Sequence, residues 1–200
     1  MAEAFTLWFT GITHSGKSTI GSAVGDALRA RGLSVELLDS ARIRAYTNRG
    51  LGFTKREIEI NVLRLGYECL LLNRNGVVAI VMAVSPYRDA RDQVRRQIPR
   101  FVEVYCRCPL DVLRRRDTSE LFARAERGEV EHLAGVNAPY EEPLHAEIVL
   151  DTDKLTADQA ARQVLARLEE LGHIERVEPA TYTAEEEEMI RQRLQNMGYL

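Results

Sequence analysis

The sequence predicts an α/β protein with a mainly parallel five-stranded sheet and helices on both faces. Apolar runs typical of strands alternate with segments of helical periodicity along most of the chain, and such alternation is typical of parallel sheets. Residues 77–84 form a continuous apolar run, as expected of a strand that is buried on both faces. The composition agrees, because 45% hydrophobic and 28% charged residues are ordinary for a soluble domain.

In the first half of the chain, each expected element has a pattern or an end signal. Apolar runs predict strands at residues 5–10, 35–38 and 77–84. Helical periodicity predicts helices at residues 17–31 and 55–73. The first helix is followed by Gly32, a favourable residue after a helix end, and the second by an Asn75-Gly76 turn.

The second half continues the alternation with shorter elements. Strands are expected at residues 101–106 and 148–150, and helices at residues 88–97, 109–116, 121–127 and 156–171. Pro99 ends the first of these helices, and Pro109 suits the first turn of the second. The segment 121–127 is expected to be a lid-like element.

The composition shifts near residue 175, which predicts a main domain at residues 1–174 and an extension at residues 175–200. Pro179 breaks the chain, and the following segment begins with acids and ends with bases, which suits the dipole of a terminal helix. A narrow apolar stripe in it consists of Met189, Ile190, Leu194 and Met197. This helix is expected either to pack on the body or to dock a partner.

Charge and hydropathy exclude two classes of partner. A net charge of −3 and a pI near 5.9 give no basic field for nucleic acid. No apolar run reaches the length that crosses a membrane, and no signal peptide is recognisable. We therefore expect a cytoplasmic protein.

A phosphate-binding loop is the strongest functional signal. Residues 11–18 read GITHSGKS and match G-x-x-x-x-G-K-[ST] between an expected strand and an expected helix. Backbone N–H groups and the helix N-terminus would cradle phosphates, with catalytic Lys17 at the β- and γ-phosphates of ATP and Ser18 on Mg²⁺. His14 is expected to be a variable position of the loop rather than a catalytic group. The residues expected to bind the nucleotide here are Gly11, Thr13, His14, Ser15, Gly16, Lys17, Ser18 and Thr19.

The loop does not specify the acceptor of the phosphoryl group. The sequence contains neither an NKxD base specifier nor a DxxG switch of the GTPase type. The length and the arginine-rich second half favour a small-molecule kinase whose lid closes over the transferring phosphate.

Several segments in the same order resemble the adenylylsulfate (APS) kinase family. They are Val84-Ser85-Pro86-Tyr87-Arg88 with Arg91 and Arg95 behind it, Phe101 to Tyr105, Arg116-Asp117, Pro139-Tyr140-Glu141 and Leu150-Asp151-Thr152. The resemblance covers about residues 5–171. It implies a three-layer P-loop kinase fold, a homodimer, and transfer of the ATP γ-phosphoryl group to the 3′-hydroxyl of APS with Mg²⁺.

The resemblance also implies residue roles. Arg116 and Asp117 would belong to the nucleotide lid. Asp39 would be a catalytic acid near the acceptor hydroxyl. The positions expected to contact the acceptor are Asp39, Arg44, Phe53, Asn61, Arg64, Ser85, Pro86, Tyr87 and Arg88.

The departures from the family pattern concentrate on the acceptor side. Where the family has a second acid after Asp39, this chain has Ala41, which can neither bind a metal nor accept a proton. Other replaced positions are Ile58, Ile60, Ser119, Glu120 and Leu133. Three hypotheses therefore stay open: an APS kinase that tolerates these changes, a related kinase with another nucleotide conjugate or small molecule as acceptor, and a non-catalytic nucleotide-binding module.

Overall fold

A computed structural model describes residues 3–47, 49–176, 189, 191–193 and 195 of the chain. Its centre is one five-stranded sheet in the order β2-β3-β1-β4-β5. The strands are β1 (Thr6–Thr10), β2 (Val35–Asp39), β3 (Val78–Met82), β4 (Phe101–Arg107) and β5 (Ile148–Asp151). All four strand pairs are parallel, with Leu7 of β1 opposite Ile80 of β3 and Val102 of β4. The five expected strands and the α/β class are confirmed, and the sheet is parallel throughout.

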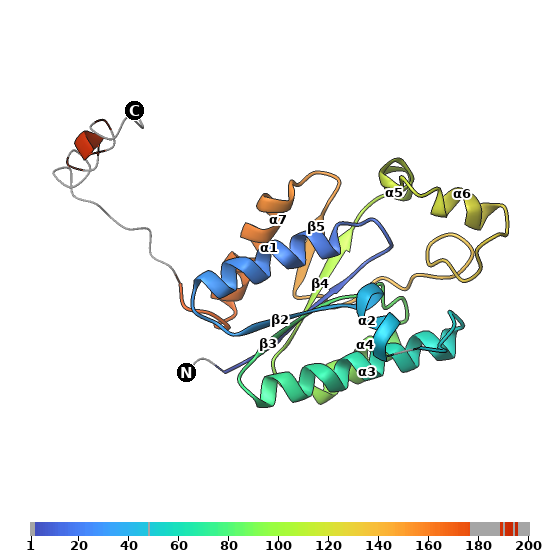
Figure 1. The fold of residues 1–200 in the computed structure, drawn as a ribbon, viewed down its shortest axis with the longest axis horizontal. Coiled ribbons are helices and arrows are strands. Elements are labelled where there is room, and N and C mark those ends of the chain that lie inside the picture. The colour runs from blue at the N-terminus through green and yellow to red at the C-terminus, as the bar shows by residue number, and fades with distance from the viewer. Residues whose placement is uncertain (1–2, 48, 177–188, 190, 194, 196–200) are drawn as a thin grey trace.

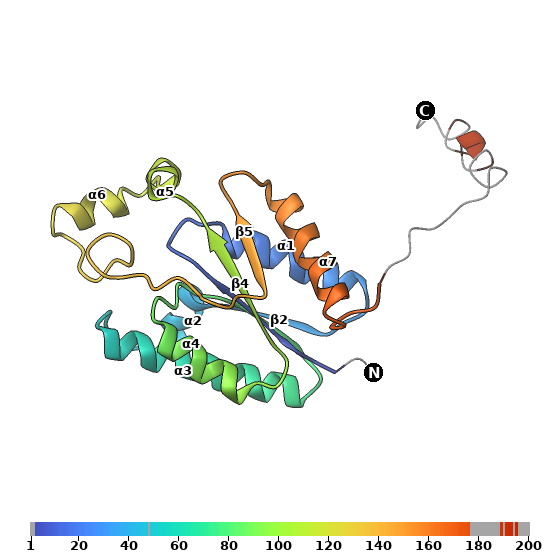
Figure 2. The same cartoon turned by 180° about the vertical axis from the view of Figure 1, so that it is seen from behind.

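Helices cover both faces of this sheet (Figure 1). The helices are α1 (Lys17–Ala30), α2 (Ser40–Thr47), α3 (Lys55–Arg74), α4 (Arg88–Gln97), α5 (Leu110–Arg116), α6 (Leu121–Glu126) and α7 (Ala157–Glu170). In both views α1 and α7 lie on one face and α3 and α4 on the other, while α5 and α6 extend beyond the end of the sheet (Figure 2). The arrangement is the expected three-layer fold.

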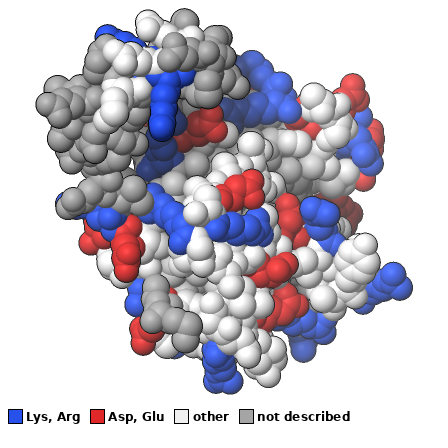
Figure 3. All heavy atoms as spheres, turned by 60° about the vertical axis from the view of Figure 1, so that its left-hand side comes forward, with Lys and Arg blue, Asp and Glu red and all other residues white. Residues whose placement is uncertain are grey.

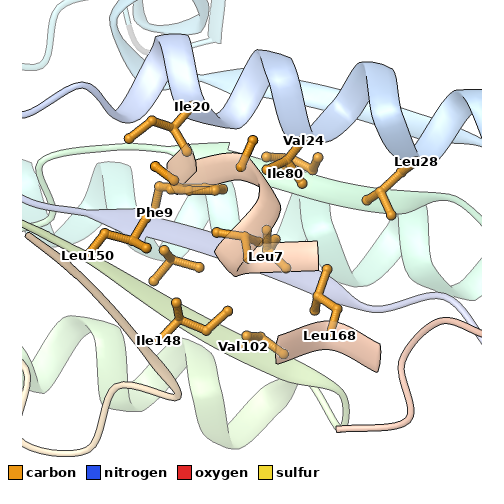
Figure 4. Close-up of a cluster of buried hydrophobic side chains, with 14 of the residues drawn as sticks. Leu7, Phe9, Ile20, Val24, Leu28, Ile80, Val102, Ile148, Leu150 and Leu168 are labelled. Atoms are coloured by element: carbon orange, nitrogen blue, oxygen red, sulfur yellow. The ribbon is translucent and has the colours of Figure 1, made fainter. Parts of the chain in front are cut away.

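Two hydrophobic cores hold the layers together. One lies between the sheet and α1 with α7, where Leu7 and Phe9 of β1 meet Val24 and Leu168 (Figure 4). The other lies between the opposite face and α3 with α4, and it includes Trp8. Successive residues of β1 point to opposite faces of the sheet, so this wholly buried strand serves both cores.

Helix α2 is an element that the sequence analysis did not expect. No residue of α2 is buried, so it lacks the apolar periodicity that reveals most helices. The Asp39 carboxylate Oδ1 accepts hydrogen bonds from the N–H groups of Ala41 (3.0 Å) and Arg42 (3.4 Å). A carboxylate that satisfies the first N–H groups of a helix is a favourable cap. Asp39 therefore ends β2 and begins α2 at once.

The extension, residues 175–200, is described at only seven positions, of which two are Glu175 and Arg176. Met189, residues 191–193 and Gln195 are helical, while the rest of the expected terminal helix lies outside the described residues. The body of the fold continues to Ile174, which is buried in the core. The boundary at residue 174 and the docking role stay predictions.

The surface carries charges of both signs. On the face drawn in Figure 3, basic and acidic side chains are interspersed. Within the described part of the chain, no helix combines the length and apolarity needed to cross a bilayer.

Candidate active site

The loop between β1 and α1 depends on two glycines with left-handed backbone geometry. At Gly11, where φ is 150°, an added Cβ would lie 2.6 Å from the Cys106 carbonyl oxygen. Gly16 precedes α1 with φ 89°, a conformation that costs other residues energy. The loop therefore packs directly against β4, and its N–H groups lead into the N-terminus of α1, which attracts anions.

Lys17 lies buried at the centre of this loop. Its ammonium donates hydrogen bonds to the carbonyl oxygens of Gly11 and Ile12, both at 2.9 Å. Burial lowers the pKa of Lys17 to about 8, although the nearby Asp39 carboxylate favours the charged form. A partly desolvated ammonium interacts more strongly with phosphate than an exposed one would.

Ser18 and Asp39 meet at the carboxyl end of the sheet. The Ser18 hydroxyl donates a 2.7 Å hydrogen bond to Asp39 Oδ2. A hydroxyl and a carboxylate are oxygen ligands of the kind Mg²⁺ prefers, and Mg²⁺ at phosphate sites needs only one or two protein ligands besides phosphate and water. The described residues include no group of three or more His, Cys, Asp or Glu side chains that could hold a metal. The pair at 18 and 39 therefore fits a kinase Mg²⁺ site and no all-protein metal centre.

One cavity of about 770 Å³ is lined both by residues expected to bind the nucleotide and by residues expected to contact the acceptor. Among the predicted site residues, those lining it are Thr13, His14, Gly16, Lys17, Ser18, Thr19, Asp39, Arg44, Phe53, Asn61, Ser85, Pro86 and Arg116. The structure thus brings together residues that are far apart in the sequence, from Thr13 in the loop to Arg116 in the expected lid.

Six predicted residues are not among those that line the cavity: Gly11, Ser15, Arg64, Tyr87, Arg88 and Asp117. Arg88 donates from Nε to the Glu142 carbonyl at 3.0 Å. The Arg64 guanidinium donates to the Thr47 carbonyl at 3.3 Å, and Tyr87 is buried. Arg88 and Arg64 therefore bond to the backbone in this structure, and Arg64 lines a second hollow rather than this cavity.

Arg44 and Asn61 come to the cavity from α2 and α3. The Arg44 guanidinium donates to the carbonyl oxygens of Leu51 (2.9 Å) and Gly52, and it lies 4.2 Å from the centre of the Phe53 ring. Asn61 Nδ2 donates to the Ser40 hydroxyl at 3.2 Å. The acceptor wall is therefore tied together across the loop between the two helices.

Ser85 forms part of a buried polar network. Its hydroxyl accepts a hydrogen bond from Trp8 Nε1 (3.0 Å) and donates to Thr10 Oγ1 (3.1 Å). Thr10 Oγ1 also donates to the Val84 carbonyl (2.8 Å) and lies 3.0 Å from the Tyr140 hydroxyl. With both sides of its hydroxyl engaged, Ser85 is placed to shape the cavity.

The departures divide between the cavity and its surroundings. Ala41, Ile58 and Leu133 line the cavity, so these three replacements change its wall directly. Ile60 faces a separate shallow hollow on α3. Ser119 donates to Asp117 from its N–H (2.9 Å) and hydroxyl (2.7 Å), which organises the turn before α6.

Sequence reasoning missed several residues at the site. Thr152, Leu155 and Ala157 line the cavity beside the loop, and the Thr152 carbonyl accepts a 2.6 Å hydrogen bond from Arg116. The available signal was that Thr152 lies two residues after the strand expected at residues 148–150, because ligands of parallel sheets bind beyond the carboxyl ends of strands.

The strand–loop–helix unit, its buried lysine, the serine–aspartate pair and the lid arginine on one cavity define a P-loop kinase. The family model for adenylylsulphate kinase matches residues 3–151. The chain belongs to the adenylylsulphate kinase family.

Relatives and solved structures agree with this assignment. An adenylyl-sulfate kinase of Rippkaea orientalis is 41% identical over 86% of this chain and 95% of its own length. A probable bifunctional SAT/APS kinase of Sorangium cellulosum is 43% identical over 87% of this chain, which spans only 30% of that protein. The APS kinase of Mycobacterium tuberculosis, solved in complex with AMPPNP and APS, has a TM-score of 0.80 and 33% identity, over 84% of this chain and 99% of that one.

Proposed function

We propose that this kinase transfers the γ-phosphoryl group of ATP to the 3′-hydroxyl of adenylyl sulfate. The observation that carries the proposal is one shared cavity, because Lys17 and the Ser18–Asp39 pair line it together with the expected acceptor residues Arg44 and Asn61. Phosphoryl transfer depends mainly on positioning and electrostatics, and both substrates of such a reaction would need to share one enclosure.

The chain's own residues suit this reaction. The loop N–H groups and Lys17 would bind the β- and γ-phosphates. Ser18 and Asp39 would hold Mg²⁺, whose positive charge would offset the charge that develops on the phosphates. Asp39 Oδ1 is engaged by the N-terminus of α2, so its carboxylate is held in one orientation toward the acceptor side. Arg116, bonded to Thr152, would border the nucleotide.

The two other hypotheses are not favoured. Relatives named adenylyl-sulfate kinase are about 40% identical over most of this chain, which argues against a non-catalytic module and against a changed acceptor. The loose transition state of phosphoryl transfer makes a second acid at position 41 dispensable in principle.

Mass spectrometry of a reaction with MgATP and APS tests the proposal. We expect one phosphoryl group to be added to APS, and the addition should depend on Mg²⁺. Intact ATP binding without any phosphorylated APS would contradict the proposed acceptor. We also propose that the protein is cytoplasmic, that it forms a homodimer, and that the helix of residues 175–200 docks a partner. A solved relative from Thiobacillus denitrificans is described as hexameric.

Restoring an acid at Ala41 should speed the reaction. Ala41 lines the cavity in the first turn of α2, where a carboxylate also suits the helix dipole. A positioned acid or base contributes about 10²–10⁴ in rate, and Asp39 already supplies part of that role, so Ala41→Asp should raise kcat with APS by about tenfold. Steady-state kinetics would measure this change.

The matched control is Ala41→Asn, which adds nearly the same volume without the charge. We expect this variant to show no gain in kcat. If the aspartate variant is no faster than the asparagine variant, then the absence of an acid at position 41 does not limit kcat.

A further inference from the structure

His14 connects the phosphate-binding loop to the lid in this structure. Its backbone has φ 67°, a conformation that is uncommon for residues other than glycine. Its Nε2 lies 3.3 Å from Asp117 Oδ1, and its ring centre lies 5.9 Å from that of Phe122 in α6. A histidine in a costly backbone conformation therefore reaches out of the loop toward the lid.

Asp117 is the fixed end of this contact. Its side chain is only 2% exposed, and it accepts hydrogen bonds from the N–H groups of Ser119 (2.9 Å) and Phe122 (2.9 Å). Burial alone would raise the pKa of Asp117, but these hydrogen bonds and the nearby His14 lower it to about 2. An ionised carboxylate thus organises the first turn of α6.

The neighbour of Asp117 reaches the nucleotide side of the cavity. Arg116 lines that cavity together with His14. A planar peptide bond joins Asp117 to Arg116, so a shift of the Asp117 backbone also moves the Arg116 backbone. The contact at position 14 is therefore in a position to influence the lid arginine.

The Nε2 atom of His14 has no hydrogen-bond partner among the described residues. Nε2 is buried and makes no hydrogen bond there, although it lies close to the Asp117 carboxylate. An unpaired buried polar atom is costly, so a small shift that completes the bond to Asp117 is favourable.

We propose that His14 is a positioning residue that joins the phosphate-binding loop to the lid through Asp117, so that phosphate binding in the loop and ordering of the lid are coupled. This proposal rests on the proposed function only through the nucleotide, and it makes no use of the acceptor. His14 belongs to the loop whose backbone would bind the phosphates. Asp117 accepts a hydrogen bond from the first turn of α6, which is part of the lid. A change at one end of the contact is therefore passed to the other.

Hydrogen exchange of the amides at residues 117–127 tests this coupling, with and without AMPPNP and Mg²⁺. The variants are His14→Gly, which removes the contact and relaxes the backbone, and His14→Phe, which keeps a ring but lacks the nitrogen. Arg115→Gln is the control, since it breaks the exposed Arg115–Asp111 pair of α5, which lies outside the cavity lining.

In the wild type and in Arg115→Gln, the nucleotide should slow exchange across the lid. In both His14 variants we expect that protection to fall by about tenfold, because the hydrogen bond to the charged Asp117 that the nucleotide would complete can no longer form, and KM for ATP to rise by a similar factor. Unchanged melting temperatures would exclude a folding defect. Wild-type protection in either His14 variant would overturn the proposal.

The readouts separate this proposal from the proposed function. Lid protection needs only the nucleotide, so a protein that orders its lid through His14 but leaves APS unchanged would refute the acceptor alone. Turnover of APS with wild-type lid protection in His14→Gly would refute the coupling alone.

Discussion

Replacing Lys17 by methionine is expected to lower kcat for phosphoryl transfer by about 10²–10³, the usual effect of removing one group that stabilises transition-state charge. The carbonyls of Gly11 and Ile12 hold the Lys17 ammonium inside the loop. A mobile basic side chain from another part of the surface would therefore not replace its charge at the phosphates. Lys154→Met is the matched control, because Lys154 is an exposed lysine that pairs with Asp151. We expect the control to keep wild-type rates in a coupled ADP-release assay.

The lowered pKa of Lys17 gives a second, independent measurement. Burial brings that pKa to about 8 in the free protein, and bound phosphates should raise it again, because opposite charge favours the protonated form. ATP binding at pH 8.5 should therefore take up a fraction of a proton, whereas binding at pH 6.5 should take up none through Lys17.

Calorimetry in buffers of different ionisation enthalpy would measure this uptake. It should vanish in Lys17→Met and persist in Lys154→Met. An uptake that survives in Lys17→Met would show that another group titrates on binding.

The nucleotide half of the site could be predicted because a contiguous segment forms it. The glycines at 11 and 16 permit the loop's backbone, and the loop joins a strand to a helix, so residues 11–19 and their geometry follow from local sequence. The second strand also ends at Asp39, as its local sequence pattern indicates. Because the carboxyl ends of parallel strands meet at one edge of the sheet, Asp39 could be placed beside the loop from the sequence.

The acceptor half depends on contacts between distant segments. Arg44 donates to the carbonyls of Leu51 and Gly52, a use that no local pattern reveals, because any exposed arginine can donate to backbone. Helix α2 lacked buried residues, although Asp39 before it was an available capping signal. A capping box formed by Thr54 and Glu57 begins α3, and its sequence pattern would also have allowed that helix start to be predicted.

Replacing Arg91 by leucine is expected to lower the free energy of unfolding by about 3–5 kcal/mol, the cost of breaking one side of a buried ion pair. Arg91 is 1% exposed, and its Nε donates to Glu103 Oε1 at 2.7 Å. Its other nitrogens donate to the carbonyls of Ser85 (2.5 Å) and Glu141 (2.7 Å). One guanidinium therefore fixes β4, the segment that follows β3, and the segment after the lid.

Urea unfolding with Arg29→Leu as the control would measure this effect. Arg29 forms an exposed pair with Asp26 and donates an exposed hydrogen bond to the Val35 carbonyl at 3.1 Å. Such a pair contributes about 0–1 kcal/mol and such a hydrogen bond about 0.5–1.5 kcal/mol, so the control should lose clearly less stability than Arg91→Leu. If Arg91→Leu costs no more than the control, the buried network does not hold the three segments together.

A double variant separates the buried charge from the loss of the two carbonyl contacts. Adding Glu103→Leu to Arg91→Leu removes the carboxylate left behind, and apolar replacement of both partners of a buried pair is often neutral or stabilising. Stability should then return in part, while Arg95 keeps its contact with Glu147. The carbonyls of Ser85 and Glu141 would still lack their donor, and Ser85 carries a left-handed φ of 38°. The double variant should therefore fold yet bind APS more weakly than the wild type, because the wall of the cavity at Ser85 is no longer held in place.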